Sequence, residues 1–131
     1  MEQLISKLKS QRVREAYLFG SRADGRATDT SDWDIGVRFT DKLDLLPSMS
    51  RLANLEMELK HLLGAPVDVI DIDDAHLTLL YEIIWKGQSL FSDDEDGRIQ
   101  RELTVRRKFE DYQRIQSFYT QALKERLGVG S

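Results

Sequence analysis

The sequence predicts an α/β (α+β) fold in which a small mixed β-sheet is backed by helices. Two observations predict it. Short apolar runs typical of strands alternate with helical apolar stripes along the chain, the order that places helices against a sheet. The chain has 131 residues, of which 40% are hydrophobic and 32% charged. That is enough to bury the core of a single domain, so we expect one domain over 1–131.

The first quarter of the chain predicts a helix and two strands. Residues 1–12 carry leucine and isoleucine at helical spacing, which indicates an amphipathic helix. Residues 16–19 read Ala-Tyr-Leu-Phe, a buried strand that Gly20 stops. Residues 21–31 are rich in Gly, Asp, Thr and Arg and predict a loop, in which a short helix could begin at once. Residues 32–39 alternate polar and apolar side chains, as a half-buried strand does.

The middle of the chain predicts a long helix followed by a third strand. Leucine and methionine recur along residues 45–63 with the period of a helix that packs one face on a core. Gly64 and Pro66 end this helix. Residues 67–71 read Val-Asp-Val-Ile-Asp, a strand pattern. A strand here could pair beside residues 32–39.

A shorter helix and an edge strand complete the predicted sheet. Residues 75–85 show a helical apolar pattern. Asp73 or Asp74 could cap its start, because aspartate accepts hydrogen bonds from free backbone N–H groups there. Gly87 would close it. Residues 88–91 then predict a small edge strand.

The chain ends in a segment of opposite charge. Residues 1–97 carry 11 Lys/Arg against 19 Asp/Glu, whereas residues 98–131 carry 8 against 4. Residues 92–97 form an acidic turn and residues 98–127 a long basic helix with scattered aromatic side chains. These aromatics do not share one narrow stripe, which favours two packing partners, the domain itself and a second protein. We therefore divide the domain into a core at 1–91 and a partner interface at 92–131.

Composition excludes several classes of function. The chain has no cysteine, so disulfides, cysteine zinc sites and thiol nucleophiles are excluded. A reducing compartment, the cytoplasm, is expected. The N-terminus has no long apolar run, which predicts neither a signal peptide nor a membrane span. The net charge of -4 argues against direct nucleic-acid binding.

The residues that indicate chemistry follow the first predicted strand. Gly20 and Ser21 come directly after it, and Asp32 and Asp34 begin the next strand. Side chains two apart in a strand share a face, so these carboxylates should stand about 6 to 7 Å apart at the backbone. They repel each other unless a cation lies between them, and hard oxygen ligands favour Mg²⁺. A Gly-Ser step before a helix offers N–H groups to phosphate.

A two-metal site needs a third carboxylate, and two residues of one strand compete for that role. Asp68 could lie beside Asp32 and Asp34, bridge a metal and accept a proton from an attacking hydroxyl. Asp71 faces the other side of a regular strand, so the two are not expected to serve together. We assign Asp71 to loop solvation or helix capping.

At these residues the sequence resembles the DNA polymerase β-like nucleotidyltransferases. Gly20-Ser21, ten residues, then Asp32-x-Asp34 is their signature. The small size is similar to the minimal nucleotidyltransferase (MNT) branch. The segments 66–71 and 80–87 and the basic aromatic helix resemble the MntA-type antitoxins within it.

The resemblance implies roles for the residues and a reaction. It implies that Gly20 and Ser21 bind the triphosphate and that Asp32 and Asp34 bind Mg²⁺, with two ions at the site. Asp68 falls on the third carboxylate. Arg22 follows the Gly-Ser step and could contact phosphate.

Antitoxins of this kind pair with a HEPN-domain ribonuclease toxin in a hetero-oligomer. They transfer AMP from ATP to a toxin tyrosine and release pyrophosphate. Two alternatives remain open: an antitoxin that neutralises its toxin by binding alone, and a nucleotidyltransferase that acts on a small-molecule hydroxyl.

Overall fold

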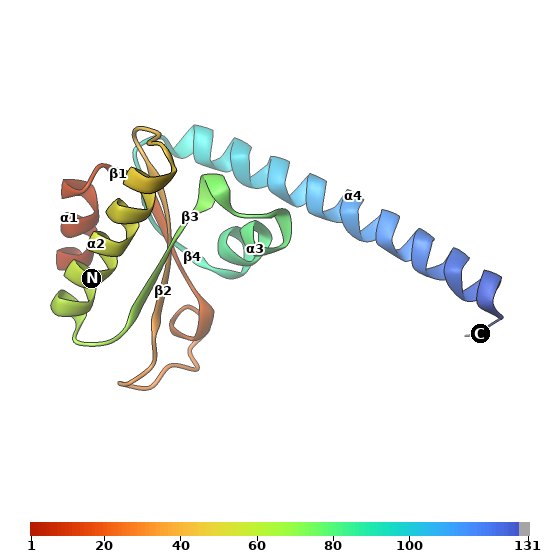
Figure 1. Cartoon of the computed structure of the whole chain (residues 1–131), viewed down its shortest axis with the longest axis horizontal. Helices are drawn as coiled ribbons and strands as arrows, with labels where there is room; N and C mark the ends of the chain where they lie inside the picture. Colours follow the sequence, from red (N-terminus) through yellow and green to blue (C-terminus); the bar gives the residue numbers. More distant parts are fainter. Residues whose placement is uncertain (129–131) are drawn as a thin grey trace.

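The computed structural model describes residues 1–128 and has the predicted mixed α/β architecture (Figure 1). In these residues four strands form one sheet, and a long helix is the last element. In order, the elements are α1 (Glu2–Ser10), β1 (Val13–Phe19), η1 (Gly20–Arg22), β2 (Trp33–Phe39), α2 (Leu45–Leu63), β3 (Val67–Asp71), η2 (Ile72–Asp74), α3 (Leu77–Tyr81), η3 (Glu82–Lys86), β4 (Gln88–Ser92) and α4 (Glu95–Leu127).

The sheet is mixed, with the strand order β3-β2-β1-β4. The central strand β1 pairs antiparallel with both β2 and β4, and β2 pairs parallel with β3. A parallel pair needs a crossover, and α2 supplies it. Strand β3 therefore lies beside β2, as predicted, and β4 is the edge strand on the other side.

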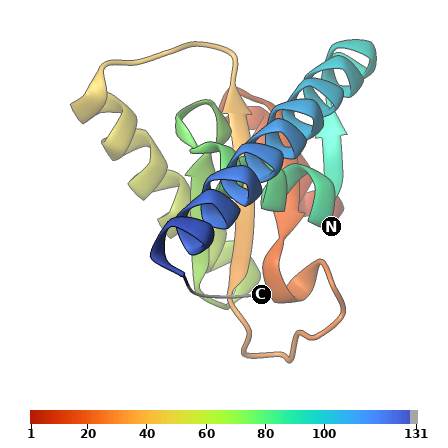
Figure 2. The same ribbon diagram turned by 90° about the vertical axis from the view of Figure 1, so that its right-hand side faces the viewer.

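Helices cover both faces of the sheet. Helices α1 and α2 lie on one face, while α3, η3 and α4 lie on the other (Figures 1 and 2). Alternation along β1 divides its side chains between the two cores: Ala16 and Leu18 belong to the larger core under α1 and α2, and Tyr17 belongs to the smaller one with Ile72 and Ile83. We call the second side the α4 face.

Two predicted elements have the predicted bounds, and others differ at their ends. The helix 45–63 and the strand 67–71 are confirmed as α2 and β3. Gly64 ends α2 in a left-handed conformation at φ 67°. Strand β1 begins at Val13, three residues earlier than predicted. It includes Glu15, a charged residue that precedes the apolar run and is nevertheless buried.

The predicted cap of the 75–85 helix and the predicted start of the last helix were both wrong. His76, rather than Asp73 or Asp74, caps α3 by accepting a hydrogen bond from the backbone N–H of Leu79. The two aspartates lie in the η2 turn instead. Helix α4 begins inside the predicted acidic turn, because Asp94 accepts from the N–H of Gly97 and caps the helix there.

The far half of α4 extends beyond the rest of the domain (Figure 1). Val105 is the buried residue of α4. Apolar side chains farther along are exposed; they are Tyr112, Ile115, Phe118, Tyr119, Leu123 and Leu127, and we call residues 112–127 the arm. Exposed apolar residues gathered on one helix are typical of a protein interface. In the described part of the chain, no helix is both long and apolar enough to cross a membrane.

Candidate active site

The structure places two of the predicted carboxylates side by side. In the parallel pairing of β2 with β3, Asp34 stands directly opposite Asp68. Asp34 also shares a face with Gly36, two residues further along β2. A Cβ at Gly36 would meet Ile83 and Ile72 of the smaller core, so this is the α4 face. The pairing of neighbouring strands thus brings Asp34 and Asp68 together.

Gly20 lies directly against the carboxylate of Asp34. It follows Phe19, the register partner of Asp34, and adopts a left-handed φ of 73°. A Cβ at this position would overlap the Asp34 Oδ2 atom and lie 3.2 Å from its carboxyl carbon. Glycine is therefore required twice, for its backbone conformation and for the close approach of the carboxylate. Ser21 follows in the short η1 turn.

The surroundings of Asp34 raise the pKa of its carboxyl group. Burial raises its pKa first, and the negative charges of Asp68 and Asp32 raise it further. No Lys or Arg contributes to offset these charges. Asp32 itself is exposed and lies one residue before β2. The strand therefore begins at Trp33, one residue later than predicted. A cation at this position would relieve the repulsion.

The acidic residues fit a metal that takes only part of its ligands from protein. Within residues 1–128, no three acidic or histidine side chains form a complete metal-binding cluster. Mg²⁺ is commonly held by one or two carboxylates and completes its octahedral shell with water and substrate phosphates. The paired carboxylates Asp34 and Asp68 match that requirement, with Asp32 adjacent.

Arg22 fastens the loop between β1 and β2, a role that the sequence did not reveal. Its Nε and Nη2 atoms donate to the carbonyl of Ser31 at 3.1 and 2.8 Å, and Nη2 also reaches the carbonyl of Thr28 at 3.3 Å. The guanidinium lies 4.4 Å from the centre of the Trp33 ring. Arg22 thus holds the segment that leads into Asp32, and its contact with phosphate stays a prediction. Backbone carbonyl partners leave no signal in a sequence.

Asp71 has the capping role that the sequence predicted. Its side chain accepts a hydrogen bond from the backbone N–H of Asp73 and caps the η2 turn. Burial raises its pKa. It lies three residues from Asp68 along β3, so the two side chains leave a regular strand on opposite faces.

Comparison with known proteins identifies a family for most of the chain. The polymerase beta nucleotidyltransferase family matches residues 2–96. A protein adenylyltransferase, MntA, of Shewanella oneidensis is 30% identical over 83 residues, which are 63% of this chain and 57% of the relative. A putative protein adenylyltransferase of Methanocaldococcus jannaschii is 36% identical over 81 residues, which are 62% of this chain and 83% of the relative. The match therefore spans little more than half of the Shewanella relative.

Solved structures share the fold over nearly the whole chain. A toxin–antitoxin crystal structure with AMP-PNP has a TM-score of 0.72 at 23% identity and covers 96% of this chain and 97% of the solved one. A complex of a tri-AMPylated Shewanella oneidensis HEPN toxin with its MNT antitoxin has a TM-score of 0.64 at 24% identity, covering 96% and 94%. Because these likenesses cover 96% of the chain, they extend beyond residue 96, where the family match ends.

Proposed function

The chain belongs to the polymerase β nucleotidyltransferase family, and from this premise we propose that it is an antitoxin that transfers AMP from ATP to a tyrosine hydroxyl of a HEPN ribonuclease toxin. The observation that carries the proposal is the contact of Asp34 with Gly20 beside the register partner Asp68. Two relatives named as protein adenylyltransferases support the reaction, and the tri-AMPylated HEPN toxin in a related complex supports the acceptor.

The proposed reaction uses the residues at the ends of three strands. The triphosphate lies on the backbone of Gly20 and Ser21, where N–H groups at the start of the η1 turn would meet its charge. The acceptor oxygen attacks the α-phosphorus in line, the bond to the bridging oxygen breaks, and pyrophosphate leaves. Asp68 takes the hydroxyl proton. Asp34 and Asp68, with Asp32 adjacent, would hold Mg²⁺, and its charge would offset the charge on the attacking and leaving oxygens.

The arm supplies the surface for the toxin in this proposal. Its exposed side chains include Phe118 at 70% and Tyr119 at 66% of full exposure, and aromatic residues are enriched in interface cores. The related structures that cover α4 are toxin–antitoxin complexes. The added AMP would place bulk and negative charge where RNA phosphate must bind, which inactivates the ribonuclease.

Intact mass spectrometry of the partner tests the proposal. The product of the neighbouring gene is co-expressed with this protein and weighed. We expect its mass to rise in steps of one nucleoside monophosphate, and tandem fragmentation should place the addition on tyrosine. A neutralised partner of unchanged mass would contradict AMP transfer and favour an antitoxin that acts by binding alone.

Two substitutions in β3 decide which aspartate completes the site. Asp68→Asn should lower the rate of AMP transfer about a hundredfold or more, the size expected for a lost general base. Asp71→Asn makes the same change three residues away, on a side chain that caps η2, and should leave transfer within about twofold while weakening the turn. Rates are measured with α-labelled ATP. Loss of activity in Asp71→Asn alone would reverse the assignment.

A further inference from the structure

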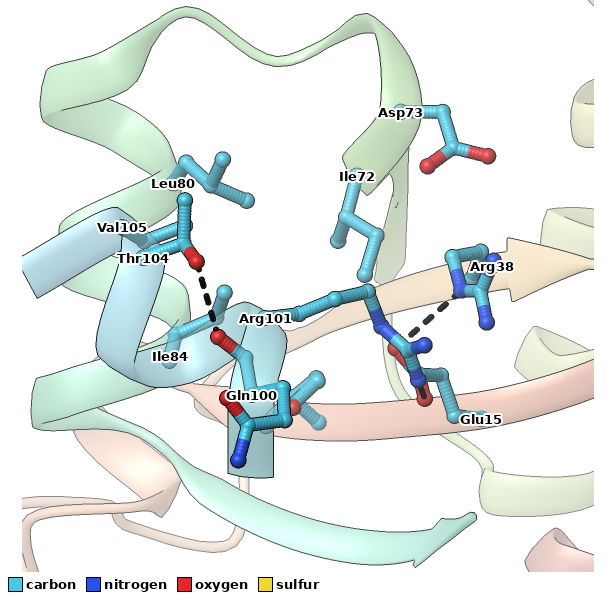
Figure 3. Close-up of a pocket in the computed structure, with 11 residues that line it drawn as sticks. Glu15, Arg38, Ile72, Asp73, Leu80, Ile84, Gln100, Arg101, Thr104 and Val105 are labelled. Carbon is cyan, nitrogen blue, oxygen red and sulfur yellow. Dashed lines mark hydrogen bonds and ion pairs between the residues drawn. The ribbon is translucent and has the colours of Figure 1, made fainter. Parts of the chain in front are cut away.

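Glu15 is a buried charge that joins the sheet to α4. It is only 1% exposed, yet it lies in β1 on the α4 face beside Tyr17. Its carboxylate accepts from Arg38 Nε at 3.2 Å on the neighbouring strand and from Arg101 Nη2 at 2.5 Å on α4 (Figure 3). The Ser92 hydroxyl donates to it at 3.1 Å. A charge buried so deeply is tolerated only with such partners.

A second polar contact lies one residue further along α4. The hydroxyl of Tyr17 donates to Glu102 at 2.8 Å, and the indole N–H of Trp85 donates to the Glu102 carbonyl at 3.0 Å. Burial and the neighbouring carboxylate raise the pKa of Tyr17, so it remains a hydrogen-bond donor at neutral pH. The base of α4 is therefore tied to the sheet by hydrogen bonds and an ion pair.

The base of α4 does not rest on a filled core. A cavity of about 280 Å³ lies between α4, the η2 turn and the sheet. Figure 3 shows its lining, with Ile72, Leu80 and Ile84 opposite Arg101. The side chains of α4 that line this open pocket face solvent on that side and pack on fewer protein atoms, so they contribute less to holding the helix. The polar contacts are then needed to fix its direction.

A second point of attachment lies two turns away. Phe109 of α4 stacks on Tyr81 of α3 with ring centroids 4.0 Å apart. Two fixed points define the direction of a rod, and Arg101 and Phe109 are about 12 Å apart along a helix that rises 1.5 Å per residue. With the Arg101 contact removed, the base of α4 keeps the Glu102 contacts with Tyr17 and Trp85 but loses its ion pair, so it is held less firmly and the helix can tilt about the aromatic stack.

We infer that the Glu15–Arg101 ion pair is a positioning device, which sets the direction of the arm and so presents the docked acceptor to Asp34 and Asp68. This rests on the proposed function. The arm leaves the sheet on the face that carries both aspartates, and α4 crosses in front of β2 and β3 (Figure 2). Residues 109–127 span about 27 Å, so a 10° tilt about the aromatic stack moves the far end by about 5 Å. Such a displacement takes an acceptor hydroxyl out of reach of the α-phosphorus.

Spin labels measure the direction of the arm without any reaction. Since the chain has no cysteine, Lys60→Cys on α2 and Gln121→Cys on α4 give two unique labelling sites. We expect one narrow distance distribution in the parent protein. Arg101→Met should broaden it, while Glu15 keeps Arg38 and Ser92 and the sheet stays folded. Arg107→Met, the same change at an exposed position of α4, should leave it narrow. Arg101→Lys keeps the positive charge, so its distance distribution should be narrower than that of Arg101→Met and broader than that of the parent protein.

Kinetics with the toxin as acceptor then separates positioning from folding. In Arg101→Met we expect kcat with the toxin as acceptor to fall about tenfold, because small misplacements of bound reacting groups are costly. The KM for ATP should stay unchanged. An unchanged distance distribution would overturn the inference, as would a broadened distribution with an unchanged kcat, or a raised KM for ATP. If the parent protein transfers no AMP, the proposed function fails, while the distance measurement still judges the ion pair.

Discussion

Asp34→Asn is expected to lower AMP transfer by about a thousandfold, because the variant would lose a ligand of the Mg²⁺ that offsets transition-state charge. The substitution keeps the size of the side chain and removes its charge. Asp34 is the carboxylate in contact with Gly20 and opposite Asp68, so no other residue can replace it at that point. Asp32→Ala should also abolish transfer.

Label from α-labelled ATP on the partner protein is the measurement, with Asp29→Asn as the control. Asp29 is an exposed residue of the loop before β2 and should behave as the parent does. The fold of Asp34→Asn should survive, because a repelled carboxylate is being neutralised. Transfer at the parental rate by this variant would refute the assignment of the site.

The raised pKa of Asp34 also gives the site a defined pH response. In the metal-free protein the folded state holds the Asp34 proton more tightly than the unfolded chain does, so the ionised carboxylate costs stability at neutral pH. Stability is recovered as the pH falls through the raised pKa. Magnesium needs the ionised form, so its affinity should fall over the same range. Calorimetric titration with Mg²⁺ between about pH 4 and pH 7 checks the direction, and Asp34→Asn should not show it.

Gly20→Ala is expected to reduce AMP transfer by about a hundredfold or more, since even small displacements of reacting groups carry that cost. Its new methyl group would occupy the position of the Asp34 carboxylate. The left-handed backbone adds strain of about 1 to 2 kcal/mol. The carboxylate must then move away from Asp68, or the turn that we propose binds phosphate must change.

Gly25→Ala separates these two effects. Gly25 has a similar φ of 81°, but a Cβ there would meet nothing within 4 Å. This variant should therefore lose about the same stability from backbone strain and keep its transfer activity. Thermal unfolding and transfer rates are measured on both variants. Equal loss of activity in the two would show that backbone strain, rather than contact with Asp34, explains the effect of Gly20→Ala.

The sequence predicted the elements with strong local patterns. The 45–63 stripe and the Gly64 stop specified α2 completely, and alternation specified β2 and β3 to within a residue. The Gly-Ser step and the aspartate pair also indicated the candidate site. The number of residues between them is set by the single connection that joins the adjacent strands β1 and β2. The pairing of Asp34 with Asp68 followed from placing β3 beside β2.

Long-range contacts could not be predicted in the same way. Glu15 lies just before the predicted strand at residues 16–19, and its partners 23 and 86 residues away explain its burial. Arg22 was predicted to contact phosphate because it follows the Gly-Ser step. Its bonds to loop carbonyls could not be predicted, because backbone carbonyl partners have no sequence signal. His76 caps α3 in place of the predicted Asp73 or Asp74, because both aspartates lie in the η2 turn before the helix.

The short link between α2 and β3 determines toward which face of the sheet the Asp68 side chain points. Gly64, Ala65 and Pro66 separate the two elements, and the N–H of Trp33 donates to the Pro66 carbonyl at 2.9 Å, fixing where β3 starts against β2. A slip of one position in this link would turn Asp68 toward α2 and bring an apolar neighbour in its place. We therefore expect that inserting a single residue in this link abolishes activity. In the loop that precedes Asp32, insertions of an odd or an even number of residues should be tolerated equally.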